Sequence, residues 1–221
     1  MRKHMHRPLR GGWVGCIELT EAEGIAMIEI KRVDALAGFQ PSDIAAVLVG
    51  GFAEDFAYFS KDQETLARAF AHMIIPERFY VALVDGVPAA IASLTEADQE
   101  CFTPDRSEFQ RHLGTWHGLI SYFIVRTQFL GAFKGARPGL AEIGFVTTAP
   151  QYQGRGVATE LMKHLLALPF DEFVLRDIKD TNVAALSLYR KLGFSESDSR
   201  PARFAKRAGF SRYVSMNRKA A

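Results

Sequence analysis

The sequence predicts an α/β domain in which helices flank a central sheet. Three stretches carry this prediction. Residues 79–94 read as two strands joined by an Asp-Gly hairpin turn. Residues 141–168 read as a strand, a turn with two glycines, and a helix with a doubled apolar stripe. Residues 173–194 read as a strand followed by a capped helix that ends at a glycine.

The first half of the chain contributes one more strand and two helices. Apolar residues alternate with polar ones from Ile25 to Val33, as in a half-buried strand. The segments 41–43 and 60–63 carry polar helix-start residues, and apolar residues follow each of them at helical spacing. The expected order is therefore strand, helix, helix, strand, turn, strand before residues 141–168.

Composition limits the class of protein. The 221 residues are 48% hydrophobic and 24% charged, which is typical of a soluble domain with a sizeable core. The net charge of +2 creates no global field that would attract nucleic acid. Two cysteines, Cys16 and Cys101, lie in unrelated contexts, which indicates a reducing compartment without a disulfide framework.

Residues 1–24 read as an N-terminal extension that is poorly ordered. They are basic but lack the apolar stretch and cleavage site of a signal peptide. No apolar run approaches the ~18–20 residues that a membrane span requires. We therefore expect a cytoplasmic protein without a membrane partner. His4 and His6 read as part of the basic tail and not as metal ligands.

The turn after the 141–148 strand has the features of a phosphate site. A strand that ends in a glycine turn and enters a helix presents backbone N–H groups and the positive end of the helix dipole. Gly154 and Gly156 would let a pyrophosphate approach the backbone. The residues that define a P-loop or a Rossmann fingerprint are absent. The alternative is an ordinary tight turn before a helix.

Two motifs in this region resemble the GCN5-related N-acetyltransferase (GNAT) family. The loop resembles the family's acetyl-coenzyme A motif, Gln/Arg-x-x-Gly-x-Gly/Ala, in two frames that begin at Gln151 and Gln153. A second motif downstream matches the family pattern of an asparagine, a small residue and Leu-Tyr-x-x-Leu-Gly-Phe. Its residues are Asn182, Ala185, Leu188, Tyr189, Leu192, Gly193 and Phe194. The resemblance covers residues 26–217, firmly over 141–195.

The resemblance implies a fold of the acyl-CoA N-acyltransferase type. This is a mixed, mostly antiparallel central sheet of six or seven strands flanked by helices, here a single domain over 25–221. A helical insertion at about 96–140 departs from the family, which often has a short turn there. Within it, 107–130 reads as one amphipathic helix. This helix either walls the acceptor site or is an extra packing helix or dimer surface.

The resemblance also implies where the coenzyme binds. The fourth strand of the family carries a bulge, expected here near Thr147 and Thr148, and splays from the fifth so that the pantetheine arm pairs with its free edge. The backbone N–H of Val146 would receive the oxyanion. The expected coenzyme-binding residues are Phe145, Val146, Thr147, Gln151, Gln153, Gly154, Arg155, Gly156, Val157, Ala158 and Asn182. Asn182 also reads as a helix cap.

Two residues are the expected catalytic groups. Glu142 lies in an Ala-Glu-Ile setting, as does the base of histone-type family members, and burial in an apolar strand would raise its pKa. The alternatives are an edge-exposed surface glutamate or a water chain as the base. Tyr189 matches the family tyrosine that protonates the coenzyme thiolate, and its alternative role is helix packing.

The predicted function is transfer of an acetyl group from acetyl-CoA to a primary amine by direct attack in a ternary complex. The alternatives are an acyl-CoA-binding sensor without catalysis or transfer of a longer acyl group. We expect a small-molecule or peptide amine as acceptor, no metal and no nucleic acid, and the inserted helix offers a surface for a homodimer. The basic segment 197–210 reads as a loop that faces water or flanks the acceptor or coenzyme. Its basic residues are Arg200, Arg203, Lys206 and Arg207.

Overall fold

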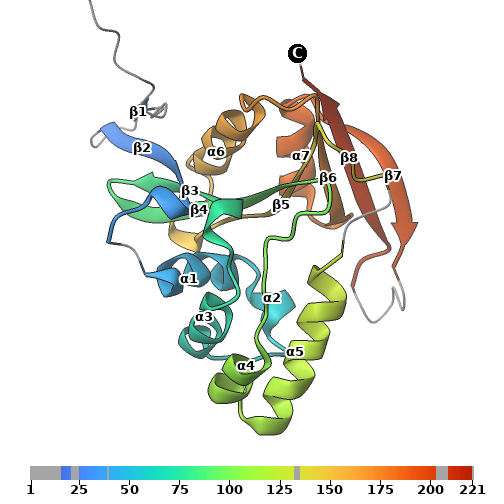
Figure 1. Cartoon of the computed structure of the whole chain (residues 1–221). Coiled ribbons are helices and arrows are strands. Elements are labelled where there is room, and N and C mark those ends of the chain that lie inside the picture. The colour runs from blue at the N-terminus through green and yellow to red at the C-terminus, as the bar shows by residue number, and fades with distance from the viewer. Residues whose placement is uncertain (1–15, 21–24, 39, 132–134, 203–208, 221) are drawn as a thin grey trace, which may run out of the picture.

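A single mixed sheet organises the protein (Figure 1). The computed structural model describes residues 16–20, 25–38, 40–131, 135–202 and 209–220. Within them the sheet has eight strands in the order β1-β2-β3-β4-β5-β6-β8-β7. Of the strand pairs described, β5 and β6 run parallel and the others antiparallel. The predicted fold class, a mostly antiparallel mixed sheet flanked by helices, is confirmed.

The strands are β1 (Cys16–Thr20), β2 (Ile25–Arg32), β3 (Phe79–Val84), β4 (Val87–Glu96), β5 (Leu140–Thr148), β6 (Glu172–Lys179), β7 (Ser195–Pro201) and β8 (Arg212–Lys219). The helices are η1 (Val33–Ala35), α1 (Pro41–Gly51), α2 (Ala53–Phe56), α3 (Gln63–Ala71), η2 (Pro76–Arg78), α4 (Arg106–Leu113), α5 (Thr115–Phe129), η3 (Pro150–Tyr152), α6 (Val157–Leu166) and α7 (Val183–Lys191).

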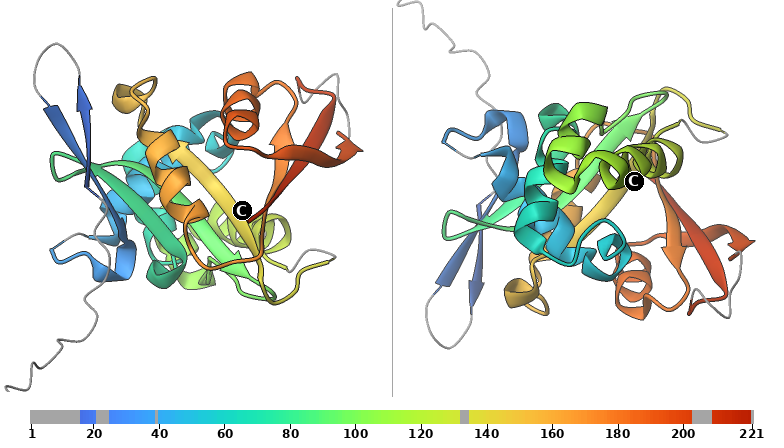
Figure 2. Two further views of the ribbon diagram at one scale, coloured as in Figure 1. Left: turned by 90° about the horizontal axis from the view of Figure 1, so that it is seen from above. Right: turned by 90° about the horizontal axis from the view of Figure 1, so that it is seen from below.

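Helices cover the sheet on both faces, as the two views of Figure 2 show. The alternation of side chains along a strand creates the two cores. Val81 and Leu83 of β3 belong to the core under α1 and α3, whereas Ala82 and Val84 belong to the core under α6 and α7. α4 and α5 extend the first core, to which Phe109 and Val125 contribute buried side chains.

The central strands β5 and β6 separate along their length. Their parallel pairing covers three residue pairs and ends at Glu142 opposite Val174. β6 then continues in an antiparallel ladder with β8, and β5 continues with β4. The sheet is therefore open beyond Glu142, as the resemblance implied.

The prediction of one helix over 107–130 is wrong. The helix breaks at Gly114, whose φ of 84° and ψ of 160° lie outside the helical region, and α5 turns back against α4. The close approach is possible because residue 118 is glycine: a Cβ there would lie 2.4 Å from the carbonyl oxygen of Phe109. Part of the expected apolar stripe consequently faces outward, with Trp116 77% and Phe123 55% exposed.

Two further segments differ from expectation. Residues 195–201, predicted as a loop from 197, form the edge strand β7, because β8 offers its free edge for pairing. Residues 16–20, within the predicted extension 1–24, form β1 on β2, so the sheet has one strand more than the six or seven expected. His4, His6, Arg203, Lys206 and Arg207 lie outside the described residues.

Candidate active site

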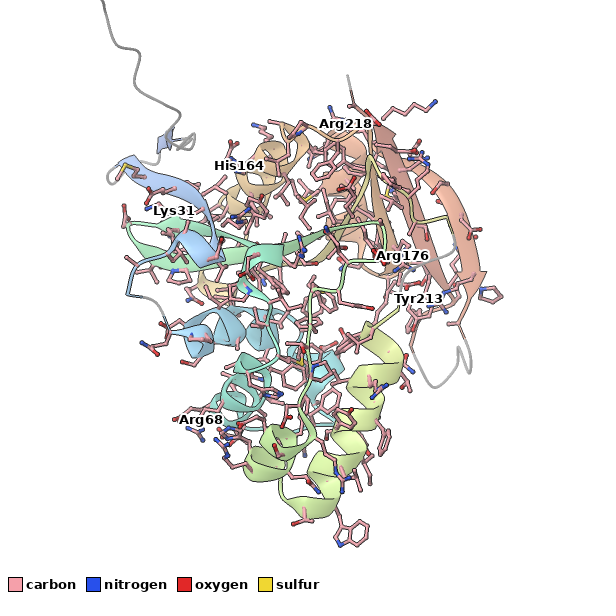
Figure 3. The ribbon with its side chains drawn as sticks, in the orientation of Figure 1. Lys31, Arg68, His164, Arg176, Tyr213 and Arg218 are labelled. Atoms are coloured by element: carbon pink, nitrogen blue, oxygen red, sulfur yellow. The ribbon has the colours of Figure 1, made fainter. Side chains whose placement is uncertain are left out.

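A cavity of about 480 Å³ lies where β5 and β6 separate. Tyr189 on α7, Phe129 on α5 and Asp177 on β6 are among the residues that line it. Arg176 and Tyr213, labelled in Figure 3, belong to its wall. The predicted catalytic residues Glu142 and Tyr189 both line it, as do Phe145, Val146 and Asn182 from the predicted coenzyme site.

A β-bulge interrupts β5 at the cavity. Gly144 pairs with Ser93 and Thr147 with Ile91, so Phe145 and Val146 together oppose one residue of β4. Phe145 has a φ of 49°, a strained conformation for a residue with a large side chain. The predicted bulge therefore exists, but at 145–146 and not at 147–148. The position matters because a bulge frees ladder N–H and C=O groups for a ligand.

Thr147 does not offer its side chain to the cavity. It is buried, and α1 packs so closely upon it that a Cβ at Gly51 would lie 1.4 Å from its Oγ1. Thr147 is not among the residues that line the cavity. Any contact of Thr147 with a ligand would consequently use its backbone.

Glu142 is a half-buried carboxylate bound by Arg176. The two groups form a bidentate ion pair, with Nε to Oε1 at 2.9 Å and Nη2 to Oε2 at 3.1 Å. Burial raises the pKa of Glu142, and the charge and hydrogen bonds of Arg176 oppose that rise. The burial of Glu142 and the direction of its pKa shift agree with the expectation from the sequence, whereas the ion pair with Arg176 was not expected and the alternative of an edge-exposed surface glutamate is wrong.

Asp177 is a cavity residue that the sequence alone did not predict. It has a φ of 57° at a bulge in β6, where Leu175 pairs with Met216 and Ile178 with Val214. Its Oδ1 accepts hydrogen bonds from Nε and Nη2 of Arg200 at 3.1 and 2.9 Å. The sequence signal was the charged pair Arg-Asp inside an otherwise apolar strand segment, but spacing alone does not reveal a bulge.

Tyr189 is buried, with 5% of its surface exposed. Burial raises its pKa above the ordinary tyrosine value, so the phenol keeps its proton across the neutral range. Asn182 positions the helix that carries it: the Asn182 Oδ1 accepts a hydrogen bond from the backbone N–H of Ala185 at 3.2 Å, which caps α7. The predicted capping role is confirmed for Asn182.

Cys101 also lines the cavity and has a free, buried thiol. Burial raises the pKa of this thiol to about 12. A thiol in that state is a poor nucleophile at neutral pH.

The glycine loop leads from β5 into α6. Gly154 and Gly156 have φ of 76° and 79°, and Gly156 is the N-cap of α6. A Cβ at either glycine would meet no protein atom within 4 Å, so packing does not require them. The exposed surface of Gln151 and residues 153–156 leaves the start of α6 open to an anion. These features fit a phosphate-bearing ligand.

The two predicted frames of the loop place their last residue differently. The frame beginning at Gln151 ends on Gly156, the left-handed N-cap. The frame beginning at Gln153 ends on Ala158, inside α6, and the Nε2 of Gln153 donates a hydrogen bond to the Thr148 carbonyl at 3.1 Å. Val157 is buried in the core under α6, and Arg155 stacks over the ring of Tyr152.

A family model described as "Acetyltransferase (GNAT) family" matches residues 51–194, which include the glycine loop, the bulge and Tyr189. The chain belongs to the GNAT family. N-alpha-acetyltransferase RimI of Mycobacterium tuberculosis (strain ATCC 25618 / H37Rv) is 31% identical in an alignment 129 residues long that covers 50% of this chain and 80% of that relative. This GNAT protein is an acetyltransferase.

Solved structures of N-acetyltransferases share the fold. The ribosomal-protein-S18-alanine N-acetyltransferase of Escherichia coli aligns with a TM-score of 0.52 and 16% identity, covering 88% of this chain and 95% of that one. An N-acetyltransferase from Staphylococcus aureus Mu50 aligns with a TM-score of 0.54 and 18% identity, covering 86% and 99%. At these identities the likeness establishes the fold alone.

Membrane spans and metal clusters are absent from the described residues. No described helix combines the length and the apolar character needed to cross a membrane. In the same part of the chain, no three His, Cys, Asp or Glu side chains are grouped to hold a metal ion.

Proposed function

We propose that this GNAT protein transfers an acetyl group from acetyl-CoA to a primary amine by direct attack in a ternary complex. The observation that carries the proposal is the cavity at the β5–β6 separation, because it brings the bulge at Phe145, the Glu142 carboxylate and the Tyr189 phenol together. The GNAT family uses acetyl-CoA as co-substrate, which supplies the activated acetyl group.

The glycine loop is proposed to hold the pyrophosphate of the coenzyme. The backbone N–H groups of residues 154–158 and the dipole of α6 provide the binding groups, because the N–H of Gln153 already donates to the carbonyl oxygen of Pro150. The left-handed Gly156 at the helix start favours the frame that begins at Gln151. The open β5 edge next to the bulge is suited to the pantetheine arm, because it offers unpaired strand positions.

The residues around the cavity have complementary proposed roles. The amine nitrogen forms a bond to the thioester carbonyl carbon, and the carbon–sulfur bond breaks. In this proposal the Val146 N–H stabilises negative charge on the carbonyl oxygen. A carboxylate accepts the proton that the amine loses, and Tyr189 donates a proton to the departing sulfur.

Two carboxylates compete for the role of base. Glu142 has a pKa raised by burial, which favours proton acceptance near neutral pH, but both of its oxygens are bound by Arg176. Asp177 uses only Oδ1 in its hydrogen bonds to Arg200. We propose Glu142 as the base, acting directly or through water, and the pH profiles of variants at Arg176 and Arg200 distinguish it from Asp177.

Direct attack is favoured over an acyl-enzyme route. Cys101 lines the cavity, but its pKa of about 12 leaves it protonated and weakly nucleophilic. The proton donor and the proposed bases face a common space, so a ternary complex needs no covalent relay.

The name of one relative favours an α-amine as acceptor. The Mycobacterium tuberculosis relative is called an N-alpha-acetyltransferase. An α-amine with a pKa of about 7.7–8.0 is largely accessible in its neutral form near pH 8, unlike a lysine amine near 10.4. We therefore propose an α-amine or a small amine of similar basicity.

Calorimetric titration of acetyl-CoA tests the donor and the loop. Wild type should bind, and Gly154→Glu should lose binding, because the added carboxylate lies where phosphate is expected. Gly38→Glu is the matched control: Gly38 also has a positive φ of 82°, a Cβ there would meet no atom within 4 Å, and it lies away from the loop. Failure of wild type to bind would overturn the proposal.

Thiol release separates enzyme from sensor. An acyl-CoA sensor would bind acetyl-CoA but release no thiol with any amine, and Glu142→Gln and Tyr189→Phe would leave its binding unchanged. The remaining alternative is that the enzyme transfers a longer acyl group. Longer acyl-CoA thioesters test it, and thiol release as fast as or faster than with acetyl-CoA would indicate a longer acyl donor.

A further inference from the structure

One wall of the cavity is aromatic. Phe52, Phe56, Phe129 and Phe145 line it, coming from the end of α1, from α2, from α5 and from β5. Their rings contact one another: the centroids of Phe56 and Phe129 are 5.9 Å apart, and those of Phe129 and Phe145 are 5.5 Å apart. The four rings therefore form one continuous apolar surface rather than scattered contacts.

This aromatic wall begins at the proposed reaction centre. Phe145 is itself a residue of the β5 bulge and has a left-handed backbone conformation. Its ring contacts the rings of Phe52, with the centroids 6.2 Å apart, and of Phe129. Val146, the proposed oxyanion donor, is its chain neighbour. An amine that attacks there must place its own carbon skeleton beside these rings.

Carboxylates from several elements also line the cavity. Four carboxylates line it, and three of them are held in ion pairs. These are Asp55 with Lys179, Glu142 with Arg176, and Asp177 with Arg200.

The fourth carboxylate, Glu100, differs from these three. Its Oε1 accepts a hydrogen bond from the Gly131 N–H at 2.7 Å, and it has no ion pair among the described residues. The bond to Gly131 fixes a half-buried negative charge in the wall of the cavity. A cation that enters the cavity meets this charge.

We propose that the acceptor is a primary amine whose skeleton next to the nitrogen is apolar, with the aromatic wall binding the skeleton and Glu100 attracting the ammonium group. The inference rests on the proposed acetyl transfer and specifies its substrate class. Aromatic rings bind both apolar carbon and, through their π faces, a nearby ammonium ion. A hydroxyl or carboxylate beside the nitrogen would be desolvated against the rings without a partner.

Two kinds of acceptor combine an amine with an adjacent apolar skeleton, and the experiment distinguishes them. A free arylalkylamine and a peptide whose first residue is apolar present the same groups. Initial rates at saturating acetyl-CoA are measured with 2-phenylethylamine and ethanolamine, and with tripeptides that begin with Phe or Ser. We expect kcat/KM to favour the apolar member of at least one pair by about tenfold or more. The pair that is turned over identifies the kind of acceptor.

Phe129 and Glu100 variants test the wall and the charge. Phe129→Ala should reduce the apolar preference about tenfold, and Phe129→Leu should reduce it less, because burial of a ring contributes most of the selectivity. The matched control is Phe123→Ala, on the same helix with its ring 55% exposed.

Glu100→Gln keeps an acceptor for Gly131 and should raise the amine KM about fivefold at unchanged acetyl-CoA affinity. Asp98→Asn, exposed in the same loop, is its control.

The outcomes separate this inference from the proposed function. If acetyl-CoA binds and amines are acetylated, but apolar and polar acceptors react equally, the substrate class is wrong and the enzyme assignment stands. Unchanged selectivity in folded Phe129→Ala and Phe129→Leu overturns the role of the aromatic wall. An unchanged amine KM in Glu100→Gln overturns the role of that charge. If the wild-type protein does not bind acetyl-CoA, the proposed function itself is overturned.

Discussion

Arg176 on β6 binds both carboxylate oxygens of Glu142 on β5, at 2.9 and 3.1 Å, at the point where the two strands stop pairing. The last parallel pair joins Glu142 to Val174, two residues before Arg176. The ion pair consequently bridges the beginning of the separation that forms the cavity. It also acts on the pKa of the proposed base, since burial raises the pKa of Glu142 and Arg176 opposes that rise.

The pH profile should respond to Arg176. In Arg176→Met, burial acts on Glu142 without the opposing cation, so the pKa of Glu142 rises further. A base works only when deprotonated. The acid limb of the kcat/KM profile should therefore move to higher pH, while Glu142→Gln loses that limb and about 10²–10⁴ in kcat. Initial rates from pH 5 to 9 provide the measurement.

Arg200→Met is the matched control for that experiment, because it removes the partner of Asp177 and leaves the Glu142 pair intact. A shift of the acid limb in Arg200→Met, with none in Arg176→Met, would transfer the role of base to Asp177.

Tyr189→Phe should slow turnover without abolishing it. The variant loses the proton donor, but a thiol of pKa ~8.5 is a tolerable leaving group near neutral pH, so we expect kcat to fall about 10- to 100-fold. Acetyl-CoA affinity should stay the same. Because burial raises the pKa of Tyr189, wild type should show no basic limb from this residue below pH ~10.

Tyr122→Phe, on α5 and outside the cavity lining, controls for loss of a phenol elsewhere. A Tyr189→Phe enzyme with wild-type kcat would reduce Tyr189 to a packing residue of α7.

Cys101→Ala should remain active. Burial raises the pKa of the Cys101 thiol to about 12, so the thiol stays protonated at pH 8 and is a poor nucleophile for an acyl-enzyme route. We expect kcat within about threefold of wild type, intersecting rather than parallel double-reciprocal plots, and slow alkylation by iodoacetamide. Detection of an acetyl thioester on Cys101 by mass spectrometry during turnover would contradict direct attack.

Periodicity predicted the elements that depend on local patterns. The 79–94 hairpin and the α6 and α7 helices follow from alternation, turn residues and caps, and they appear where the sequence placed them. The prediction of a single helix over 107–130 was wrong because the spacing of apolar residues fits one helix. The break at Gly114 depends instead on the tertiary packing of Gly118 against α4. The prediction of a loop from residue 197 was wrong because the polar sequence of β7 has no strand pattern. Pairing with β8 makes this segment a strand.

The site also contains residues that local motifs predict and residues that only the fold brings together. The glycine loop, Glu142 and Tyr189 belong to local motifs, and the structure places the two catalytic candidates in one cavity. Asp177, Glu100 and the aromatic wall come together from segments distant in sequence, so no spacing predicts their proximity. The bulge position also escaped prediction, because Phe145 adopts a backbone conformation that its residue type disfavours.

Gly51 should be essential for packing and its neighbour Gly50 should not. Gly51→Ala would place a Cβ 1.4 Å from the Oγ1 of Thr147, so α1 or β5 must shift beside the bulge. We expect a loss of about 1–3 kcal/mol in the free energy of unfolding and a lower kcat. Gly50→Ala meets nothing within 4 Å and should be neutral or stabilising by up to about 1 kcal/mol. Equal urea midpoints for the two variants would refute the close contact.

His72 should make the protein less stable in mild acid. Its Nε2 accepts a hydrogen bond from the Asp105 N–H at 3.0 Å, and its Nδ1 is buried without a hydrogen-bond partner among the described residues. Burial lowers the pKa of His72, although the charges of Glu108 and Asp105 and the backbone of Ala69 oppose that effect, and His112 adds to it. The folded state therefore binds fewer protons than the unfolded state, in which the pKa is about 6.5.

The resulting stability is complete above pH ~6.5 and is lost as the pH falls through that value toward the lower folded pKa. His72→Gln keeps a hydrogen-bond acceptor without a titrating ring, so the difference in unfolding free energy between pH 8 and pH 5.5 should shrink. His164→Gln should shrink it independently, because burial also lowers the pKa of His164, on the far face of the sheet. Hydrogen exchange distinguishes the two: acid should expose amides of α4, which Asp105 caps, in wild type but not in His72→Gln. Equal acid sensitivity of α4 in both proteins would contradict the role of His72.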